Sequence, residues 1–199
     1  MTMAFNPIRP ERTTIAPFLD RLKSLYAEID NTFTKLSSYY GFRCKGCTDN
    51  CCRTRFFHFT FSEYFFIVEG FRTLSSEMRQ KITDRAFDVG KQPEKADREG
   101  TEVRFMCPLN IDGLCVLYEY RPMICRLHGI PHELHRPGNK VVYGPGCGFF
   151  ETHCHHKEYV VFDRTSVYAE IAELEKELRA ALRTNDKIKL SIAQMLLNA

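Results

Sequence analysis

The segment Cys44-Lys-Gly-Cys47-Thr-Asp-Asn-Cys51-Cys52 places four cysteines within nine residues of this 199-residue chain. Two residues separate Cys44 from Cys47, and this spacing lets both thiolates bind a single metal ion. On a helix, at about 100° per residue, Cys44, Cys47 and Cys51 would also share one face. We therefore expect this segment to bind metal.

Five more cysteines follow this cluster, at Cys107, Cys115, Cys125, Cys147 and Cys154. Eight thiolates can form two four-thiolate sites. Because adjacent cysteines point in different directions, one division places Cys44, Cys47 and Cys51 with a distant fourth ligand. The second site would then consist of Cys52, Cys107, Cys115 and either Cys125 or Cys147. Zinc and iron–sulfur clusters both take four cysteines, so the number of ligands leaves the metal open.

A disulfide framework is the competing interpretation of the cysteines, and it requires an oxidising compartment. The first 18 residues, MTMAFNPIRPERTTIAPF, carry charges and prolines where a secretory signal needs an apolar core. No segment reaches the roughly 18 apolar residues of a membrane span. We therefore expect a cytoplasmic protein that does not enter a membrane and whose thiols are reduced or metal-bound.

The composition, 44% hydrophobic and 13% aromatic, is that of a globular chain, and its formal net charge of +3 is mildly basic. Each ligating cysteine would add a negative charge, so we expect no nucleic-acid partner. Cationic side chains flank the cysteines, at Arg43, Lys45, Arg53, Arg55, Arg121 and Arg126. We expect them to offset the charge of a thiolate centre, with a solvated basic face as the alternative.

Histidines form a second set of candidate ligands. His153, His155 and His156 surround Cys154, and His128 follows Cys125 by three residues. Imidazole is a common zinc ligand, so these residues are secondary candidates, with exposed loop histidines as the alternative.

Covalent catalysis by one cysteine is disfavoured, because a catalytic thiol does not require eight further cysteines and a bound metal would suppress its nucleophilicity. The pair Cys44 and Cys47 lacks the alternating strands and helices of a thioredoxin-like domain. The sequence also contains no glycine-rich loop of the kind that binds a dinucleotide. No catalytic residue can be assigned.

Local patterns predict the elements. An apolar stripe predicts a helix over residues 14–40, and alternation suggests a strand over residues 56–61. Helices are expected over residues 62–71, with Ser62 as the N-cap, and over residues 75–89, capped by Ser75 or Ser76. A polar loop should follow over residues 90–100. Asp112-Gly113 predicts a hairpin turn between Cys107 and Cys115, and Pro122 can open a short helix that carries Cys125.

Two further helices are expected at the C-terminal end, over residues 165–183 and 186–197. The sequence thus predicts an α+β fold, a mainly helical single domain around a cysteine-rich centre of short strands and turns, with a C-terminal helical hairpin. We expect residues 1–160 to form a cysteine-cluster metal-binding domain with its N-terminal helix. Residues 161–199 would be the hairpin, which packs on this domain or forms a homodimer.

Several spaced motifs accompany the first cluster: Cys107-Pro108, Cys115-x2-Tyr118, and Arg121-Pro122-x2-Cys125-Arg126. Together with Cys44-x2-Cys47-x3-Cys51-Cys52 they resemble the YkgJ-like CxxCxxxCC cysteine-cluster family of zinc- or iron-chelating domains, over roughly residues 41–147. Flagellin lysine N-methylase is a relative of that family. The resemblance implies eight metal ligands: Cys44, Cys47, Cys51, Cys52, Cys107, Cys115, Cys125 and Cys147.

The leading functional hypothesis is therefore a metal-binding cysteine-cluster protein that chelates zinc or iron, the latter as an ion or an iron–sulfur cluster. The alternative is an iron–sulfur enzyme related to flagellin lysine N-methylase, which would need a pocket beside the centre and a protein substrate or partner.

Overall fold

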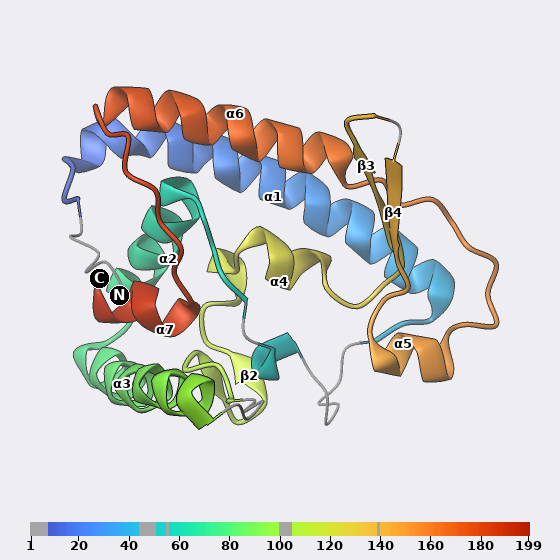
Figure 1. Cartoon of the computed structure of the whole chain (residues 1–199), viewed down its shortest axis with the longest axis horizontal. Helices are drawn as coiled ribbons and strands as arrows, with labels where there is room; N and C mark the ends of the chain where they lie inside the picture. Colours follow the sequence, from blue (N-terminus) through green and yellow to red (C-terminus); the bar gives the residue numbers. More distant parts are fainter. Residues whose placement is uncertain (1–7, 44–50, 55, 100–104, 139) are drawn as a thin grey trace.

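A computed structural model describes residues 8–43, 51–54, 56–99, 105–138 and 140–199, with the side chains of all but 51 and 91–99. Over these residues the chain is mainly helical, with two short antiparallel hairpins (Figure 1). This confirms the expected mainly helical α+β class.

Two long helices lie side by side and run antiparallel along one edge of the molecule (Figure 1). Helix α1 (Arg12–Tyr40) buries the stripe that predicted it, including Leu19, Leu22 and Ile29. It ends at Gly41, whose φ of 67° suits the left-handed C-cap position. Helix α6 (Thr165–Ala181) likewise turns its apolar stripe inward. The pair forms the layer on which α2, α4 (Met123–Leu127) and strand β3 (His132–Arg136) pack.

Helix α2 (Phe61–Thr73) lies at the centre of the molecule and is buried along most of its length. The strand expected over residues 56–61 is wrong: within the described part of this stretch only an isolated bridge joins His58 to Leu190. The N-cap is Thr60, not Ser62, because the Thr60 side chain accepts the backbone N–H of Glu63 and the helix starts earlier. No helix of the described residues is long and apolar enough to span a bilayer.

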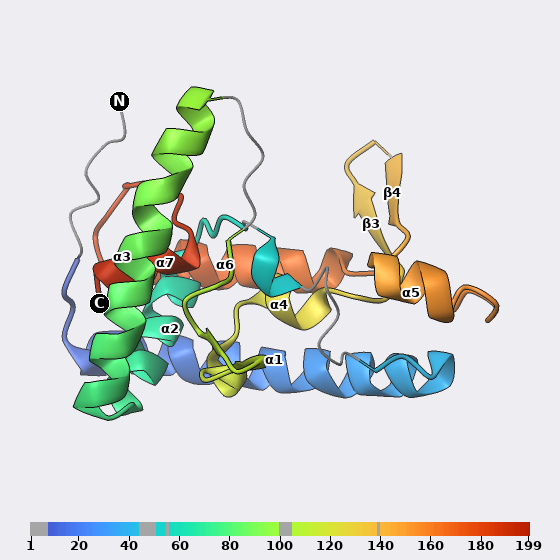
Figure 2. The same ribbon diagram turned by 90° about the horizontal axis from the view of Figure 1, so that it is seen from below.

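Helix α3 (Ser76–Glu99) runs across the direction of α1 and α6 (Figure 2). Its start agrees with prediction, since the Ser75 hydroxyl accepts the backbone N–H of Met78 at 3.2 Å. The loop expected over residues 90–100 is wrong, because the helix continues to Glu99. Apart from Gly90 and Pro93, this stretch consists mostly of good helix formers, and their propensity does not depend on an apolar stripe.

The two C-terminal helices pack on different parts of the molecule and not on each other as the arms of a hairpin. Helix α6 lies against α1 and α2, whereas α7 (Ile192–Leu197) lies against α3 and α2. Between them, Ile188 and Leu190 enter the core, which keeps this connection extended. Helix α7 therefore begins later than expected, at a capping box formed by Ser191 and Gln194.

Two hairpins complete the fold. Strands β1 (Asn110–Ile111) and β2 (Leu114–Cys115) form the hairpin predicted from Asp112-Gly113. Strands β3 (His132–Arg136) and β4 (Lys140–Gly144) form a second hairpin, which the sequence analysis did not predict. Three short helical segments lie nearby: η2 (Tyr118–Tyr120), α4 (Met123–Leu127) and α5 (Gly148–His153).

We expect the Leu178→Ala variant to lose about 2–5 kcal/mol of unfolding free energy, because this side chain of α6 is fully buried between helices. The Val161→Ala variant is a control, since Val161 is 63% exposed and should change stability by less than about 0.5 kcal/mol. Denaturant titration followed by circular dichroism measures both. Equal effects would mean that α6 is not an integral part of the core.

Candidate metal centre

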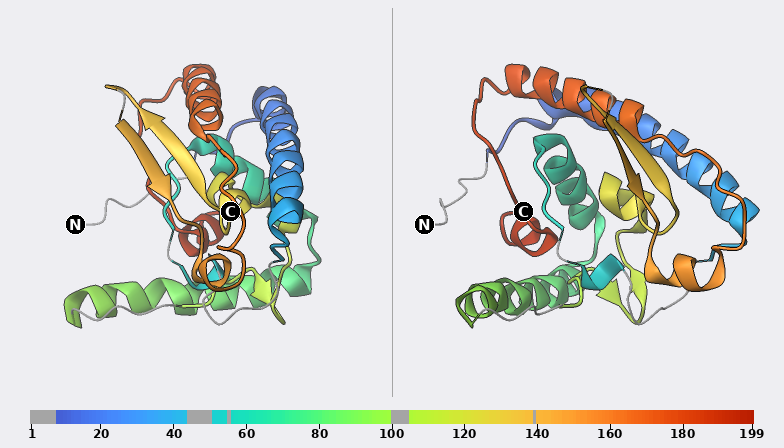
Figure 3. Two further views of the ribbon diagram at one scale, coloured as in Figure 1. Left: turned by 90° about the vertical axis from the view of Figure 1, so that its right-hand side faces the viewer. Right: turned by 45° about the vertical axis from the view of Figure 1, so that its right-hand side comes forward.

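Five cysteines border one cavity of about 410 Å³. The 3₁₀ turn η1 (Cys51–Arg53), the β1–β2 hairpin and α5 supply part of its wall, and Figure 3 shows these three elements below α4 in its right-hand view. The cysteines on its wall are Cys52, Cys107, Cys115, Cys125 and Cys147. The rest of the wall is largely apolar and includes Phe33, Phe42 and Phe149.

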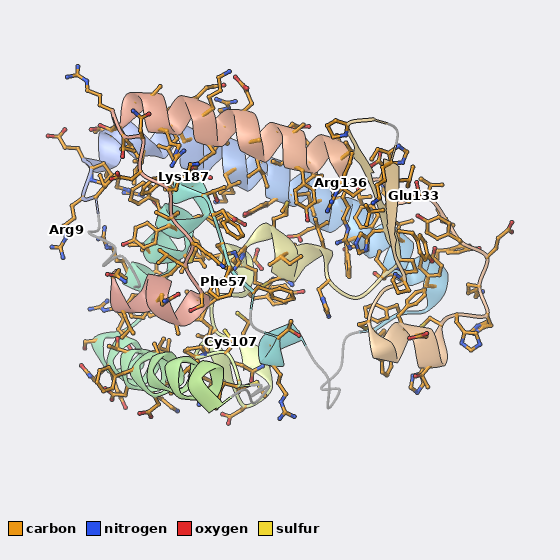
Figure 4. The ribbon with its side chains drawn as sticks, viewed as in Figure 1. Arg9, Phe57, Cys107, Glu133, Arg136 and Lys187 are labelled. Atoms are coloured by element: carbon orange, nitrogen blue, oxygen red, sulfur yellow. The ribbon has the colours of Figure 1, made fainter. Side chains whose placement is uncertain are left out.

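A backbone hydrogen bond joins the first cysteine cluster to the second group. The N–H of Cys107 donates to the carbonyl oxygen of Cys52 at 2.7 Å. Figure 4 shows Cys107 where η1 approaches α3. From α3, the Arg85 guanidinium donates to the carbonyls of Pro108 and Asn110, at 3.2 and 2.7 Å. The bond between Cys52 and Cys107 joins positions that are 55 residues apart in the sequence, and the Arg85 bonds fix the segment after Cys107 to α3.

The Cys107 and Cys115 thiols each accept a hydrogen bond from the backbone N–H two residues further on, from Leu109 and Leu117 respectively. The tight β1–β2 turn lies between these two cysteines, with Gly113 at a φ of 86° and its N–H bonded to the Asn110 side chain at 3.1 Å. Hydrogen bonds to sulfur favour the thiolate over the thiol. The same geometry therefore suits both sulfurs to be metal ligands.

Cys125 comes to the same wall from helix α4. Pro122 occupies the N-cap position of this helix, and its carbonyl oxygen accepts the Cys125 N–H at 3.0 Å. A proline is well tolerated at a helix start, so the prediction that Pro122 opens a helix carrying Cys125 is confirmed.

Four of the thiols influence one another electrostatically. Burial raises the pKa of the Cys107 thiol to about 12, and the neighbouring Cys52 and Cys115 raise it further. Burial also raises the pKa of Cys115 and of Cys125. The charges of the other three thiols raise the pKa of Cys125 further. Cys52, Cys107, Cys115 and Cys125 thus form one electrostatic group. Without a compensating cation, Cys107, Cys115 and Cys125 are held in the neutral form at pH 7.

Cys147 borders the cavity, but it interacts electrostatically with Cys154, which is not one of the four thiols above. Its N–H donates to the Gly129 carbonyl at 3.0 Å and it forms the N-cap of α5. At the other end of this helix Cys154 is buried, and its thiol pKa is raised mainly by burial and also by Cys147. Cys154 is absent from the cavity lining among the described residues.

The arginines beside Cys125 make the expected positive surroundings. Arg121 faces Cys115, whose pKa it lowers, and its guanidinium lies 3.7 Å from Asp30. Arg126 is buried with an ion pair to Asp30 and sits over the Tyr26 ring at 4.3 Å from its centroid. Two guanidinium groups thus share the Asp30 carboxylate, while the Glu63 carboxylate places a negative charge near Cys125.

The histidines divide by position. His128 borders the cavity, with its ring edge-on to Phe56 at 5.9 Å. His153 is exposed, stacks on the Phe149 ring and contacts the Phe149 carbonyl through Nδ1 at 3.1 Å. His155 and His156 are also exposed. Only His128 of these four lies on the described cavity wall.

Glu63 is the residue near the centre that sequence reasoning missed. Its side chain is 6% exposed and close enough to Cys125 for its charge to raise that thiol's pKa. The signal was the capping-box pattern Thr60-x-x-Glu63 before an apolar run, which also gives the true N-cap of α2.

Within the described residues, which exclude Cys44, Cys47 and the side chain of Cys51, no group of three or more His, Cys, Asp or Glu side chains could hold a metal ion as it stands. The donor chemistry nevertheless fits a thiophilic metal, because the wall offers thiols, amide donors to sulfur and positive charge. Comparison with family models, curated proteins and solved structures gives no match.

Two buried carboxylates should respond oppositely to pH. Burial disfavours ionisation of Glu63, but His58 and the hydrogen bonds from Met123 and Thr60 outweigh it and lower its pKa. Burial raises the pKa of Glu175 despite the N–H groups of Phe61 and Ser62. A carboxyl with a lowered pKa stabilises the fold above its unfolded pKa and loses this effect as the pH falls. One with a raised pKa behaves in the opposite way.

The stability advantage of the wild type over Glu63→Gln should therefore shrink as the pH falls from about 6 to about 3, across the ordinary glutamate pKa of roughly 4.3. Its advantage over Glu175→Gln should instead shrink as the pH rises through the same range. Urea unfolding at several pH values measures both differences. A Glu63→Gln difference that is independent of pH would contradict the lowered pKa.

Proposed function

We propose that this protein is a cytoplasmic metal-binding protein that chelates zinc or iron through thiolates, with iron held as an ion or as an iron–sulfur cluster. The main support is the gathering of Cys52, Cys107, Cys115 and Cys125 around one cavity. This set is one of the two expected from the sequence for the second site, the one in which Cys125 is the fourth ligand. A bound metal would supply the positive charge that lets buried thiols ionise.

The remaining ligands in the proposal are Cys44, Cys47 and Cys51, with Cys147 as their distant fourth partner. Cys147 borders the same cavity as the first four thiols, which supports two neighbouring sites. The resemblance to the YkgJ-like cysteine-cluster family supports the same eight ligands.

A second candidate function is that of an iron–sulfur enzyme related to flagellin lysine N-methylase, acting on a protein substrate. Its supporting observation is the cavity itself. At about 410 Å³ it falls within the range of small-ligand pockets, and its wall combines thiols with aromatic side chains. A centre with a purely structural role has no need of such space.

Metal analysis of anaerobically purified protein, together with its visible spectrum, tests the proposal. Zinc near one or two equivalents in a colourless protein would favour structural or storage chemistry. Brown protein with matching iron and sulfide would favour an iron–sulfur centre and the enzyme candidate. Protein that binds neither metal after anaerobic reconstitution would overturn the proposal.

We expect Cys107→Ser to weaken metal binding by more than about 100-fold, which exceeds the effect typical of losing a supporting group. Cys154→Ser is the matched control, because Cys154 is also buried but lies off the cavity wall, and it should bind metal as the wild type does. Competition with a chromogenic chelator measures both affinities. Equal losses in the two variants would point to general destabilisation.

Metal removal should lower the thermal midpoint by at least about 5 °C, because metal binding to a site absent from the unfolded chain adds to folding free energy. The described segment from residue 105 to 147 has only short helices and two-stranded hairpins, so it should be the part most affected. Calorimetry of chelated and metal-loaded protein checks this. Identical midpoints would show that the metal has no structural role.

A further inference from the structure

Glu63 joins three segments of the chain through one buried carboxylate. Its Oε1 accepts the Tyr26 hydroxyl of α1 at 3.1 Å and the Met123 N–H of α4 at 2.9 Å. Its Oε2 accepts the Thr60 hydroxyl at 3.0 Å and lies 3.8 Å from His58 Nδ1. This carboxylate therefore ties the start of α4 to both α1 and α2.

Helix α4 depends on such contacts for its orientation. It has only five residues, fewer than an isolated helix needs to be stable. Its second anchor is Arg126, which donates to the Arg121 carbonyl at 2.8 Å and pairs with Asp30. The Glu63 carboxylate reaches the first helical residue, Met123, two positions before Cys125, and the Tyr26 hydroxyl that bonds to this carboxylate also contacts the Met123 N–H.

We propose that Glu63 is a positioning residue for the metal centre, which fixes the Cys125 thiol by holding the first N–H of α4. This inference rests on the proposed metal-binding function. At metal sites, residues that do not bind the metal often orient the ligands through hydrogen bonds, and the proposal gives Glu63 this role. The carboxylate itself is not a ligand in this proposal.

Glu175 provides a matched control on the same helix start. It is also buried, at 8% exposure, and accepts the N–H groups of Phe61 and Ser62 at 2.9 and 3.1 Å. Its hydrogen bonds go to α2 and its ion pair goes to Arg179 of α6, so its loss should destabilise the fold without disturbing Cys125.

The probe is Co²⁺, whose thiolate-to-metal absorption grows with the number of bound thiolates. In Glu63→Ala the absorption of the site formed by Cys52, Cys107, Cys115 and Cys125 should fall by about a quarter, as in Cys125→Ser, because one of its four thiolates is misplaced. With both four-thiolate sites loaded, this is about an eighth of the total absorption. Co²⁺ affinity should fall by about 10–100-fold. Glu63→Gln should restore both values, since its carbonyl oxygen can still accept the Met123 N–H. Glu175→Ala should keep the full absorption.

A second pair of variants tests the same bond without removing the carboxylate. Met123→Pro deletes the N–H at the first helical position, where proline fits, and Pro122 already has the extended backbone that a following proline requires. It should lose absorption as Glu63→Ala does. Met123→Ala shortens the same side chain, keeps the N–H and should retain the absorption. This pair decides the question if Glu63→Ala does not fold.

The outcomes separate the two proposals. A wild-type protein without thiolate-to-cobalt absorption would overturn the metal-binding function and this inference with it. A wild type that binds Co²⁺ normally, with unchanged absorption in both Glu63→Ala and Met123→Pro, would overturn the role of Glu63 alone. Equal loss in Glu175→Ala would also overturn it, because the effect would then follow from general destabilisation.

Discussion

The cost of burying thiols is the constraint on which the rest of the structure depends. Four sulfurs border one largely apolar cavity, where burial opposes the ionisation of Cys107, Cys115 and Cys125 and the neighbouring thiols oppose it further. The surrounding structure counteracts this cost only in part, through amide donors from Leu109 and Leu117 and through the charge of Arg121. The remaining imbalance is what a bound cation would correct, and it is the physical basis of the proposed function.

The helices provide the rigid frame that this centre requires. The antiparallel pair α1 and α6 supports α2, and α2 carries the carboxylate that holds α4 in place (Figure 1). Arg85 of α3 holds the turn after Cys107 from the opposite side. The cysteines themselves lie on short segments with little core of their own. Their positions are therefore determined mainly by contacts with helices that are distant in sequence.

Predictions from local signals were the most successful. The apolar stripe of α1, the Asp112-Gly113 turn and the helix start at Pro122 depend on neighbouring residues, and the structure confirms them. Predictions that needed knowledge of distant partners failed. The stretch before α2 forms a bridge with Leu190, and the stripe expected in a C-terminal hairpin packs on α1. Neither partner can be identified from periodicity alone.

The sequence by itself determined the kind of chemistry available, because cysteine spacing and tight turns decide which sulfurs can approach one ion and which amides can reach them. Only the tertiary structure decided which cysteines gather: Cys125 joins Cys52, Cys107 and Cys115, while Cys147 faces Cys154. It also decided the place of Glu63, whose contacts with Tyr26 and Met123 no local sequence pattern indicates. The physical reason is that these contacts join helices far apart in the chain, and their geometry is set by packing.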